Sequence, residues 1–369
     1  MTGVKCTDKS RKMKRARRAR RRLIAGMTLL FLALCVILIG VLAFQFFFRE
    51  EHRAAEFELE HYNQAYDTVP FTSADLCVAA SDIDLPSAPD ASAFKAAALF
   101  DLKDLQTIYA KNVHERVYPA STTKVMTALV ALQNGNLEDV VTVSANAANR
   151  ASDESVCGLK EGDQLTLEDL LIGLLLQSGN DNAVAIAEHI AGSEEAFVEM
   201  MNEEAARLMA TNTHFVSPHG LQDDDHYTTA YDLYLIFNEA IKQDKFLEII
   251  QMDSYNAHIT HADGTEEDTA WEASNFYARG EAALPTAATV IGGKTGTTQK
   301  AGNCLILLAE DEKGDQYVSV IMGAETKDLL YTDMTALIDG GVAQTDTQTE
   351  DSGSQDGNSE TQDENTAEE

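Results

Sequence analysis

The amino-acid sequence predicts an α+β fold, in which one antiparallel sheet is flanked by helices and accompanied by a mostly helical subdomain. Two observations lead to this prediction. Strand-like runs occur near both ends of residues 93–343, and the segments between them carry helical periodicity. Strands from both ends of such a region pair most economically in a single sheet, with helices packed on it. The region is also long enough to bury a substantial core.

The first predicted element is a strand pair. Residues 94–101 and 107–111 are short apolar or alternating runs on either side of residues 102–106. Two such runs around a short connection are typical of a β-hairpin.

Helices are predicted next along the chain. The apolar stretch at 125–132 suits a buried helix, and helical spacing of apolar residues recurs at 165–176, 183–190, 195–209 and 231–242. The sequence therefore predicts a helical region that follows the hairpin.

The end of the region returns to strand character. Residues 288–291, 304–309 and 316–322 predict strands, and a turn containing Gly314 separates the last two. Residues 334–338 predict a closing helix.

The two ends of the chain differ from the region between them. Residues 1–22 carry eleven Lys and Arg against one acidic residue, residues 23–48 contain no charge, and residues 344–369 contain nine Asp and Glu. We therefore predict a basic cytoplasmic segment at 1–22, a transmembrane helix at 23–48, an extracytoplasmic linker at 49–92, a folded domain at 93–343 and an acidic disordered tail at 344–369.

The apolar run at 23–48 predicts a single-pass anchor in the cell membrane. About 20 apolar residues suffice for a helix to cross a bilayer. Because basic residues crowd the N-terminal side of the run, the positive-inside rule places the N-terminus in the cytoplasm and the folded domain outside. A cleaved signal peptide would have a shorter apolar core and end at small residues, whereas this run ends in three phenylalanines. A lipoprotein site at Cys35 would need a small residue where Leu34 stands.

Charge and cysteine content restrict the function classes. The net charge of −32 argues against nucleic acid or anionic lipid as the main partner, since both are polyanions. Cys77, Cys157 and Cys304 belong to the exported part, and their spacing matches no metal site. Whether two of them pair stays open.

The first motif with chemical content is the pair Ser121 and Lys124 at the start of the predicted helix. Residues three apart on a helix lie on the same face. A serine hydroxyl needs a nearby base to act as a nucleophile, and a lysine kept neutral by burial can supply one. By itself, a Ser and a Lys at this spacing is a common surface pattern.

Two further motifs follow. The triplet Ser-Gly-Asn at 178–180 comes directly after an apolar stretch and predicts a tight turn that presents a hydroxyl and an amide together. The triplet Lys-Thr-Gly at 294–296 is flanked by further glycines, which on an edge strand indicate close approach by a ligand. Each triplet alone also fits an ordinary turn.

In combination the three motifs are specific. The order S-x-x-K, S-x-N, K-T-G resembles that of class A β-lactamases and penicillin-binding proteins, which carry S-D-N in the middle. The chain resembles the low-molecular-mass penicillin-binding D-alanyl-D-alanine carboxypeptidases, serine peptidases of family S11. The resemblance covers about residues 94–338 and includes the segments 119–128, 177–181, 217–232 and 293–302.

This resemblance implies a β-lactamase/transpeptidase-like fold and acyl transfer through a serine. Ser121 would attack the carbonyl between two D-alanines, with Lys124 taking its proton. Ser178 would relay a proton toward the leaving amine. The result would be removal of the terminal D-alanine from the peptidoglycan stem pentapeptide, and a β-lactam would trap the acyl-enzyme. No metal or organic cofactor is implied.

The resemblance also implies the substrate-binding residues. Asn180 would position the catalytic lysine and the substrate amide, while Lys294 and Thr295, with Gly296 beside them, would bind the terminal carboxylate. The backbone N–H groups of Thr297 and of the nucleophile would form the oxyanion hole.

Some features depart from the family pattern or compete with the main hypothesis. The sequence leaves little room for the additional β-rich domain of many members, and Lys327 stands near a position where members often carry a carboxylate-binding Arg. His219 and His226 invite a Ser-His hypothesis, but the family-like segment predicts that the loop of His219 shapes the pocket.

Three alternative functions stay open on the same residues. A D,D-endopeptidase would use the same machinery on cross-linked peptides. A β-lactamase would need a deacylating carboxylate, and Glu154, Glu161 and Glu168 lack the E-x-x-x-N setting expected for one. A catalytically silent wall-binding domain would not need the intact motif residues.

Overall fold

The computed structural model describes Met27 and residues 76–353. The predicted basic segment, most of the predicted transmembrane helix and the first part of the predicted linker lie outside the described residues. Among the helices that are described, none is long and apolar enough to cross a membrane.

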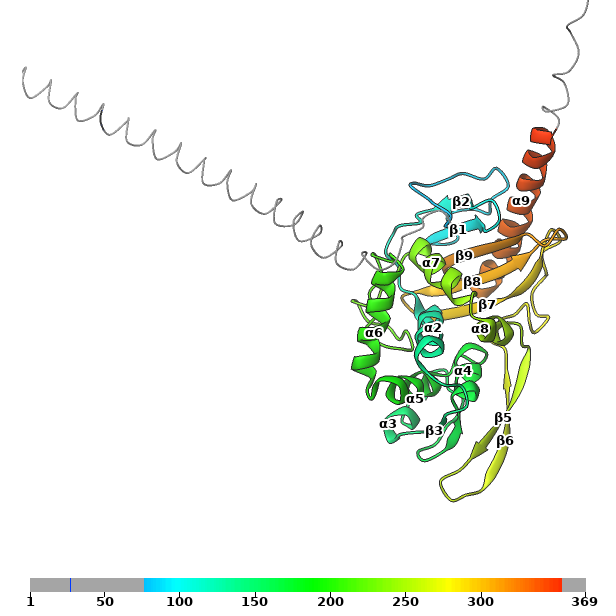
Figure 1. Ribbon diagram of the computed structural model, residues 1–369. Helices are drawn as coiled ribbons and strands as arrows, with labels where there is room; N and C mark the ends of the chain where they lie inside the picture. The colour runs from blue at the N-terminus through cyan, green and yellow to red at the C-terminus, as the bar shows by residue number, and fades with distance from the viewer. Residues whose placement is uncertain (1–26, 28–75, 354–369) are drawn as a thin grey trace, which may run out of the picture. The chain divides into compact units, whose positions relative to one another are not determined.

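A five-stranded antiparallel sheet forms the centre of the fold (Figure 1), with the strand order β2-β1-β9-β8-β7. Strands from both ends of the domain pair in it, because β1 lies between β2 and β9. The predicted α+β class is confirmed, and so is the prediction that strands from both ends of the domain pair in one antiparallel sheet. The strands are β1 (Ala96–Asp101), β2 (Gln106–Lys111), β7 (Thr289–Thr298), β8 (Gly302–Glu310) and β9 (Gln316–Ala324).

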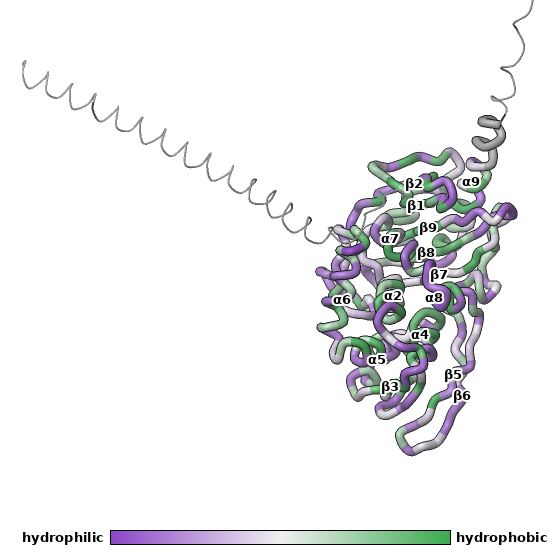
Figure 2. Tube along the Cα trace, viewed as in Figure 1, coloured by the Kyte–Doolittle hydropathy of each residue, from purple (hydrophilic) through white to green (hydrophobic). Residues whose placement is uncertain are grey.

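Both faces of this sheet are buried, and the sequence of β8 shows why. Successive side chains of a strand point to opposite faces. Ile306 and Leu308 belong to the core shared with the helical region, whereas Leu305 and Leu307 belong to a second core. The continuous apolar run of β8 therefore fits a strand covered on two sides. Figure 2 shows hydrophobic residues along these central strands.

Helices cover the sheet and extend beyond it. Helix α9 (Lys327–Gly353) contacts β9, β8 and β1, and α7 contacts β9, β1 and β8. Helix α2 lies between the sheet region and the helical subdomain, in contact with α4, α5, α6 and α7. The predicted helices are confirmed as α2 (Lys124–Asn134), α4 (Leu167–Leu175), α5 (Asn180–Ala191), α6 (Glu194–Arg207) and α7 (Ala230–Ala240).

A second sheet was not predicted from the sequence. It has the order β3-β4-β5-β6, and β5 and β6 form a long hairpin (Figure 1). In β6 only Trp271 is buried, and most of the other residues are acidic. The strand therefore lacks the alternation of apolar and polar residues that would predict it. The additional elements are β3 (Val140–Thr142), β4 (Gln164–Thr166), β5 (Ser254–Thr260), β6 (Glu266–Glu272), α3 (Ala145–Ala148) and α8 (Asp244–Ile250).

The closing helix α9 (Lys327–Gly353) is longer than predicted. Thr326 Oγ1 accepts a hydrogen bond from the backbone N–H of Leu329, which satisfies a free donor at the helix start. The helix then continues through ten residues of the segment that we predicted to be disordered. Adding residues to an existing helix costs little, whereas starting one is unfavourable. Residues 354–369 of the predicted tail lie outside the described residues.

The predicted linker at 49–92 contributes to the folded domain in its described part. Ile83 pairs with Ala110 of β2, and Cys77 and Leu85 are buried. Packed residues therefore begin before the boundary at 93 that we predicted.

Candidate active site

Ser121 lies in a tight 3₁₀ turn, η2 (Ala120–Thr123), immediately before α2. Ala120 has a φ of 49°, a conformation that side chains other than glycine rarely adopt. The hydroxyl groups of Thr122 and Thr123 donate to the backbone carbonyls of Pro119 and Ala120, at 2.7 and 2.8 Å. These local bonds hold the predicted nucleophile at a helix start, as the sequence predicted.

Lys124 is the first residue of α2 and has an exposed fraction of 0%. Its Nζ lies 3.0 Å from Ser121 Oγ and 2.7 Å from Asn180 Oδ1. A third contact, of 2.9 Å, joins Nζ to the backbone carbonyl of His219. Burial, and then the nearby charge of Lys294, hold the pKa of Lys124 well below its ordinary value. A lysine in this state can accept the proton of the serine hydroxyl.

The second motif connects α4 to α5. Ser178 adopts a φ of 68°, Gly179 is the N-cap residue, and Asn180 begins α5. Both Ser178 and Asn180 are buried. The carboxylate of Asp181 accepts backbone N–H bonds of 2.9 to 3.1 Å from residues 157–159, which fixes that loop against the start of α5. An acidic side chain is also favourable in the first turn of a helix.

The third motif lies on β7, which is an edge strand of the main sheet. Lys294 is fully buried, and its Nζ donates to Ser178 Oγ at 2.9 Å and to the backbone carbonyl of Thr295 at 3.0 Å. Burial lowers the pKa of Lys294 to about 7. The lysine of the third motif therefore contacts the serine of the second.

Gly296 allows β7 to pass directly beside the nucleophile turn. A Cβ atom at this position would lie 2.8 Å from the backbone nitrogen of Ser121 and 2.9 Å from the carbonyl oxygen of Pro119. Only glycine fits such an approach without displacement of the backbone. Thr297 follows on the same strand, and its Oγ1 donates to Asn303 Oδ1 at 3.1 Å.

The predicted site residues therefore gather in one place from distant parts of the chain. Ser121, Lys124 and Asn180 are in direct contact, as are Ser178 and Lys294. The residues of β7 that follow Lys294 border the nucleophile turn. Two serine–lysine pairs thus lie side by side across the junction of the sheet and the helical subdomain.

The two histidines have structural surroundings. His226 Nε2 lies 2.8 Å from Thr123 Oγ1, and its Nδ1 accepts the backbone N–H of Val216. His219 Nδ1 accepts the backbone N–H of Leu221. The pKa of His219 is lowered to about 3 and that of His226 to about 4, mainly because both side chains are buried. Among the hydrogen bonds of the described residues, neither histidine bonds to Ser121.

Two residues were not placed at this site from the sequence: Ser274 was not considered, and Glu154 was considered only as a β-lactamase-like carboxylate. Ser274 Oγ lies 2.9 Å from Thr295 Oγ1, and Glu154 Oε2 accepts a 2.8 Å hydrogen bond from Asn180 Nδ2. Neither belongs to a motif, so no local pattern distinguishes them. Lys327, considered for a carboxylate contact, has its Nζ over the ring of Phe276, 5.2 Å from the ring centre.

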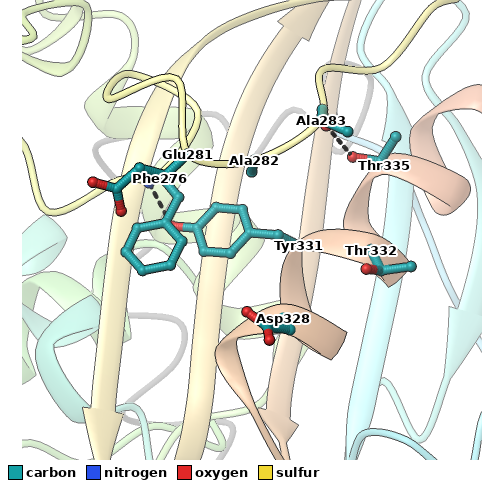
Figure 3. Close-up of a pocket in the computed structure, with 8 residues that line it drawn as sticks. All are labelled: Phe276, Glu281, Ala282, Ala283, Asp328, Tyr331, Thr332 and Thr335. Carbon is teal, nitrogen blue, oxygen red and sulfur yellow. Dashed lines mark hydrogen bonds between the residues drawn. The ribbon is translucent and has the colours of Figure 1, made fainter.

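A cavity of about 310 Å³ lies away from the motif residues, between α9 and the segment that follows β6 (Figure 3). The rings of Phe276 and Tyr331 stack there with centres 4.9 Å apart. None of the predicted site residues lines this cavity. Its lining consists of Phe276, Glu281, Ala282, Ala283, Asp328, Tyr331, Thr332 and Thr335.

Among the residues that the structure describes, no cluster of three or more His, Cys, Asp or Glu has the arrangement of a metal site. Cys77, Cys157 and Cys304 are buried free thiols.

Comparisons with known proteins agree with this geometry. The family model of peptidase S11, described as D-alanyl-D-alanine carboxypeptidase, matches residues 84–326. D-alanyl-D-alanine carboxypeptidase DacF of Bacillus subtilis is 34% identical over 262 residues, which are 69% of this chain and 63% of the relative. DacD of Escherichia coli is 34% identical over 237 residues, which are 62% of this chain and 58% of the relative. The chain thus spans less than two thirds of the length of these curated relatives.

A solved structure shows the same fold. The crystal structure of the Streptomyces K15 DD-transpeptidase aligns with a TM-score of 0.64 at 28% sequence identity. The alignment covers 71% of this chain and 100% of that one. The resemblance stated from the motifs is confirmed, and the chain belongs to the S11 peptidase family of D-alanyl-D-alanine carboxypeptidases.

Proposed function

We propose that this protein is a serine D-alanyl-D-alanine carboxypeptidase. It removes the terminal D-alanine from peptidoglycan stem pentapeptides through an acyl-serine intermediate. The observation that carries the proposal is the fully buried Nζ of Lys124, 3.0 Å from Ser121 Oγ, beside a second buried lysine on Ser178. The names of the matched relatives support the choice of substrate.

Acylation begins with the hydroxyl of Ser121. Its proton passes to the neutral Nζ of Lys124 while Oγ forms a bond to the carbonyl carbon between the two D-alanines. The backbone N–H groups of Ser121 and Thr297 stabilise the negative charge on the carbonyl oxygen. The C–N bond then breaks. Ser178 gives its hydroxyl proton to the leaving amine and takes up the proton that Lys124 accepted. Ser178 and Lys124 therefore return to their starting protonation states.

Deacylation repeats the same steps with water in place of the amine. Lys124 accepts a proton from the attacking water, the ester bond breaks, and the proton returns to Ser121 Oγ. A β-lactam enters the first half of this cycle and remains as a stable acyl-enzyme. Penicillin is therefore expected to inhibit the enzyme.

Recognition of the terminal carboxylate falls to β7. Lys294 supplies a positive charge, and Thr295 supplies a hydroxyl that Ser274 Oγ holds at 2.9 Å. Charged hydrogen bonds of this type position a carboxylate strongly. This end of the site favours peptides with a free C-terminus, which supports carboxypeptidase over D,D-endopeptidase activity.

The test of the nucleophile is labelling with fluorescent penicillin. The unmodified chain should form a covalent adduct, whereas Ser121→Ala should form none because the acylated oxygen is missing. Ser144→Ala is a matched control, since Ser144 only caps the short helix α3. Labelling of Ser121→Ala at the rate of the unmodified chain would refute the assignment.

Mass spectrometry separates the alternative functions. The full chain is incubated with a stem pentapeptide, a cross-linked dimer and benzylpenicillin in separate reactions. Loss of one alanine from the pentapeptide supports the proposal. Cleavage of the cross-linked dimer alone favours a D,D-endopeptidase. Rapid hydrolysis of benzylpenicillin favours a β-lactamase. If none of the three compounds is changed, a silent wall-binding domain is favoured.

A further inference from the structure

Glu154 lies in the connection between α3 and β4, outside every recognised motif. Its two carboxylate oxygens have different partners. Oε2 accepts a 2.8 Å hydrogen bond from Asn180 Nδ2, and Oε1 accepts a 3.0 Å bond from the backbone N–H of Ala151. The side chain is half-buried. The same connection is fixed nearby, where the backbone nitrogen of Asn180 donates to the carbonyl of Ser155 at 2.8 Å.

The amide of Asn180 is therefore held between two partners of opposite character. A carboxylate can only accept hydrogen bonds, whereas the lysine amino group carries N–H donors in both its charged and its neutral form. Lys124 Nζ contacts the amide oxygen at 2.7 Å, and Glu154 contacts the amide nitrogen at 2.8 Å. Rotation of the amide by 180° would place its nitrogen against the lysine and its oxygen against the carboxylate. Such a rotation loses both hydrogen bonds and brings two acceptor oxygens together at Glu154.

We propose that Glu154 is a positioning residue that fixes the orientation of the Asn180 amide for catalysis. The amide nitrogen carries two hydrogens, and Glu154 uses one of them. The second is then directed to the carbonyl of the substrate, while the amide oxygen stays on Lys124. The inference rests on the proposed acyl-transfer function and adds a residue to it.

The charge of Glu154 provides a readout that loss of structure alone would not change. Burial and Lys294 disfavour the protonated form of Lys124, whereas Cys157, Asp181 and Glu154 favour it. Removing the negative charge of Glu154 therefore lowers the pKa of Lys124 further. Because the base must be neutral to act, the acidic limb of the acylation rate against pH should move to lower pH.

The experiment measures the second-order rate of acylation by fluorescent penicillin between pH 4 and 9, using the full chain. We expect Glu154→Ala to slow acylation about tenfold or more, through loss of a hydrogen bond to a charged group. Glu154→Gln also slows acylation, because the single oxygen of the new side chain cannot accept from both Asn180 and Ala151. Both variants should move the acidic limb to lower pH. Glu154→Asp keeps an acceptor-only group and should recover part of the rate.

Glu161→Gln is the matched control. It removes an exposed carboxylate from the same connection, and Glu161 is not among the charged groups that act on Lys124. This variant should keep the rate and pH profile of the unmodified chain. If Glu154→Ala matches Glu161→Gln in both rate and pH profile, the inference is wrong. A slower Glu154→Ala with an unmoved acidic limb also contradicts it, since it indicates only disturbance of the loop.

A second measurement separates this inference from the proposed function. Absence of Ser121-dependent labelling in the unmodified chain would refute the proposed function. The crystal structure of Glu154→Ala, which removes the acceptor altogether, then tests the inference directly through the environment of Asn180. Loss or inversion of its contact with Lys124 Nζ supports a positioning role, and an unchanged contact overturns it.

Discussion

Lys124 and Lys294 are completely buried, and no other Lys or Arg among the described residues is buried. No carboxylate forms an ion pair with either of them within that part of the chain. Burial of an unpaired ammonium group is unfavourable, and the group tends toward its neutral form. Lys124 needs this neutral form to act as a base. The site therefore requires an arrangement that lowers the stability of the fold.

Substitution of Lys294 tests this conflict between stability and function. We expect Lys294→Met to lower kcat/KM for a stem pentapeptide by about a hundredfold, because the carboxylate loses its charged partner. The same variant should be more stable at pH 7, by on the order of 3 kcal/mol, since burial lowers the pKa of Lys294 to about 7. Urea unfolding and pentapeptide kinetics measure the two effects.

The pH dependence of that gain follows from the sign of the shift. The unfolded lysine has a pKa near its ordinary value of 10.5, and the folded one has a pKa of about 7. Between these values the unfolded state binds more protons, so the stability of the unmodified chain rises with pH. The advantage of Lys294→Met should therefore be largest below pH 7 and shrink toward pH 10. Lys160→Met, at an exposed position, should change neither quantity. A Lys294→Met chain less stable than the unmodified chain at pH 7 would contradict the argument.

At the scale of elements, the site depends on segments that approach more closely than side chains allow. Strand β7 passes the nucleophile turn at Gly296, and the loop of His219 passes it at Gly220. A Cβ atom on Gly220 would lie 2.0 Å from the carbonyl oxygen of Ala120. Gly220 also has a φ of 84°, so an L side chain is strained there as well.

A pair of glycine substitutions separates close approach from backbone strain. Gly220 and Gly264 have nearly equal φ values, 84° and 82°, but a Cβ on Gly264 meets nothing within 4 Å. Gly264→Ala should cost about 1 kcal/mol of stability from strain alone. Gly220→Ala adds the clash, so we expect at least about 3 kcal/mol and slower penicillin acylation. Equal costs for the two variants, measured by urea unfolding, would show that the approach at Gly220 is unimportant.

The elements also show what the sequence could predict. The hairpin β1–β2 and the helices α2, α4, α5, α6 and α7 were predicted because each carries a continuous apolar pattern. The hairpin β5–β6 was missed, although Tyr255, Ala257 and Ile259 alternate in β5 and a Gly264 turn follows. Its partner strand β6 buries almost nothing beyond Trp271. A strand that gains its stability from pairing leaves little pattern in its own sequence.

At the scale of the whole molecule, the motif residues were predicted but their supporting partners were not. Ser121, Lys124, Ser178, Asn180 and Lys294 come from three recognisable motifs, and the fold brings these residues together. Glu154 and Ser274 reach the same site from segments that no motif marks. Their positions follow from how the loop after α3 and the segment after β6 pack against the helical subdomain and β7. Such long-range packing has no local signal in the sequence.

The position of the domain relative to a membrane is the remaining property of the whole chain. We propose that residues 23–48 anchor the protein in the cytoplasmic membrane, with residues 1–22 inside and the catalytic domain outside. The twenty-six uncharged residues are enough to span a bilayer. The eleven Lys and Arg that precede them support a cytoplasmic N-terminus. The whole chain has a net charge of −32 although residues 1–22 are strongly basic, so the part that follows has no net electrostatic attraction to anionic lipid. Membrane binding should therefore depend on residues 23–48.

Fractionation of cells that express the full chain tests the anchor. The penicillin-labelled protein should sediment with membranes and remain there after an alkaline carbonate wash, because an inserted helix is not released by loss of charge attraction. Deletion of residues 1–48 should give a soluble protein that still labels. Protease added to intact spheroplasts should degrade the catalytic domain, since the proposed orientation exposes it. If the domain is degraded only after detergent lyses the spheroplasts, the catalytic domain lies inside and the proposed orientation is wrong. Recovery of a shortened, soluble form outside the cells would instead show that residues 23–48 belong to a cleaved signal peptide.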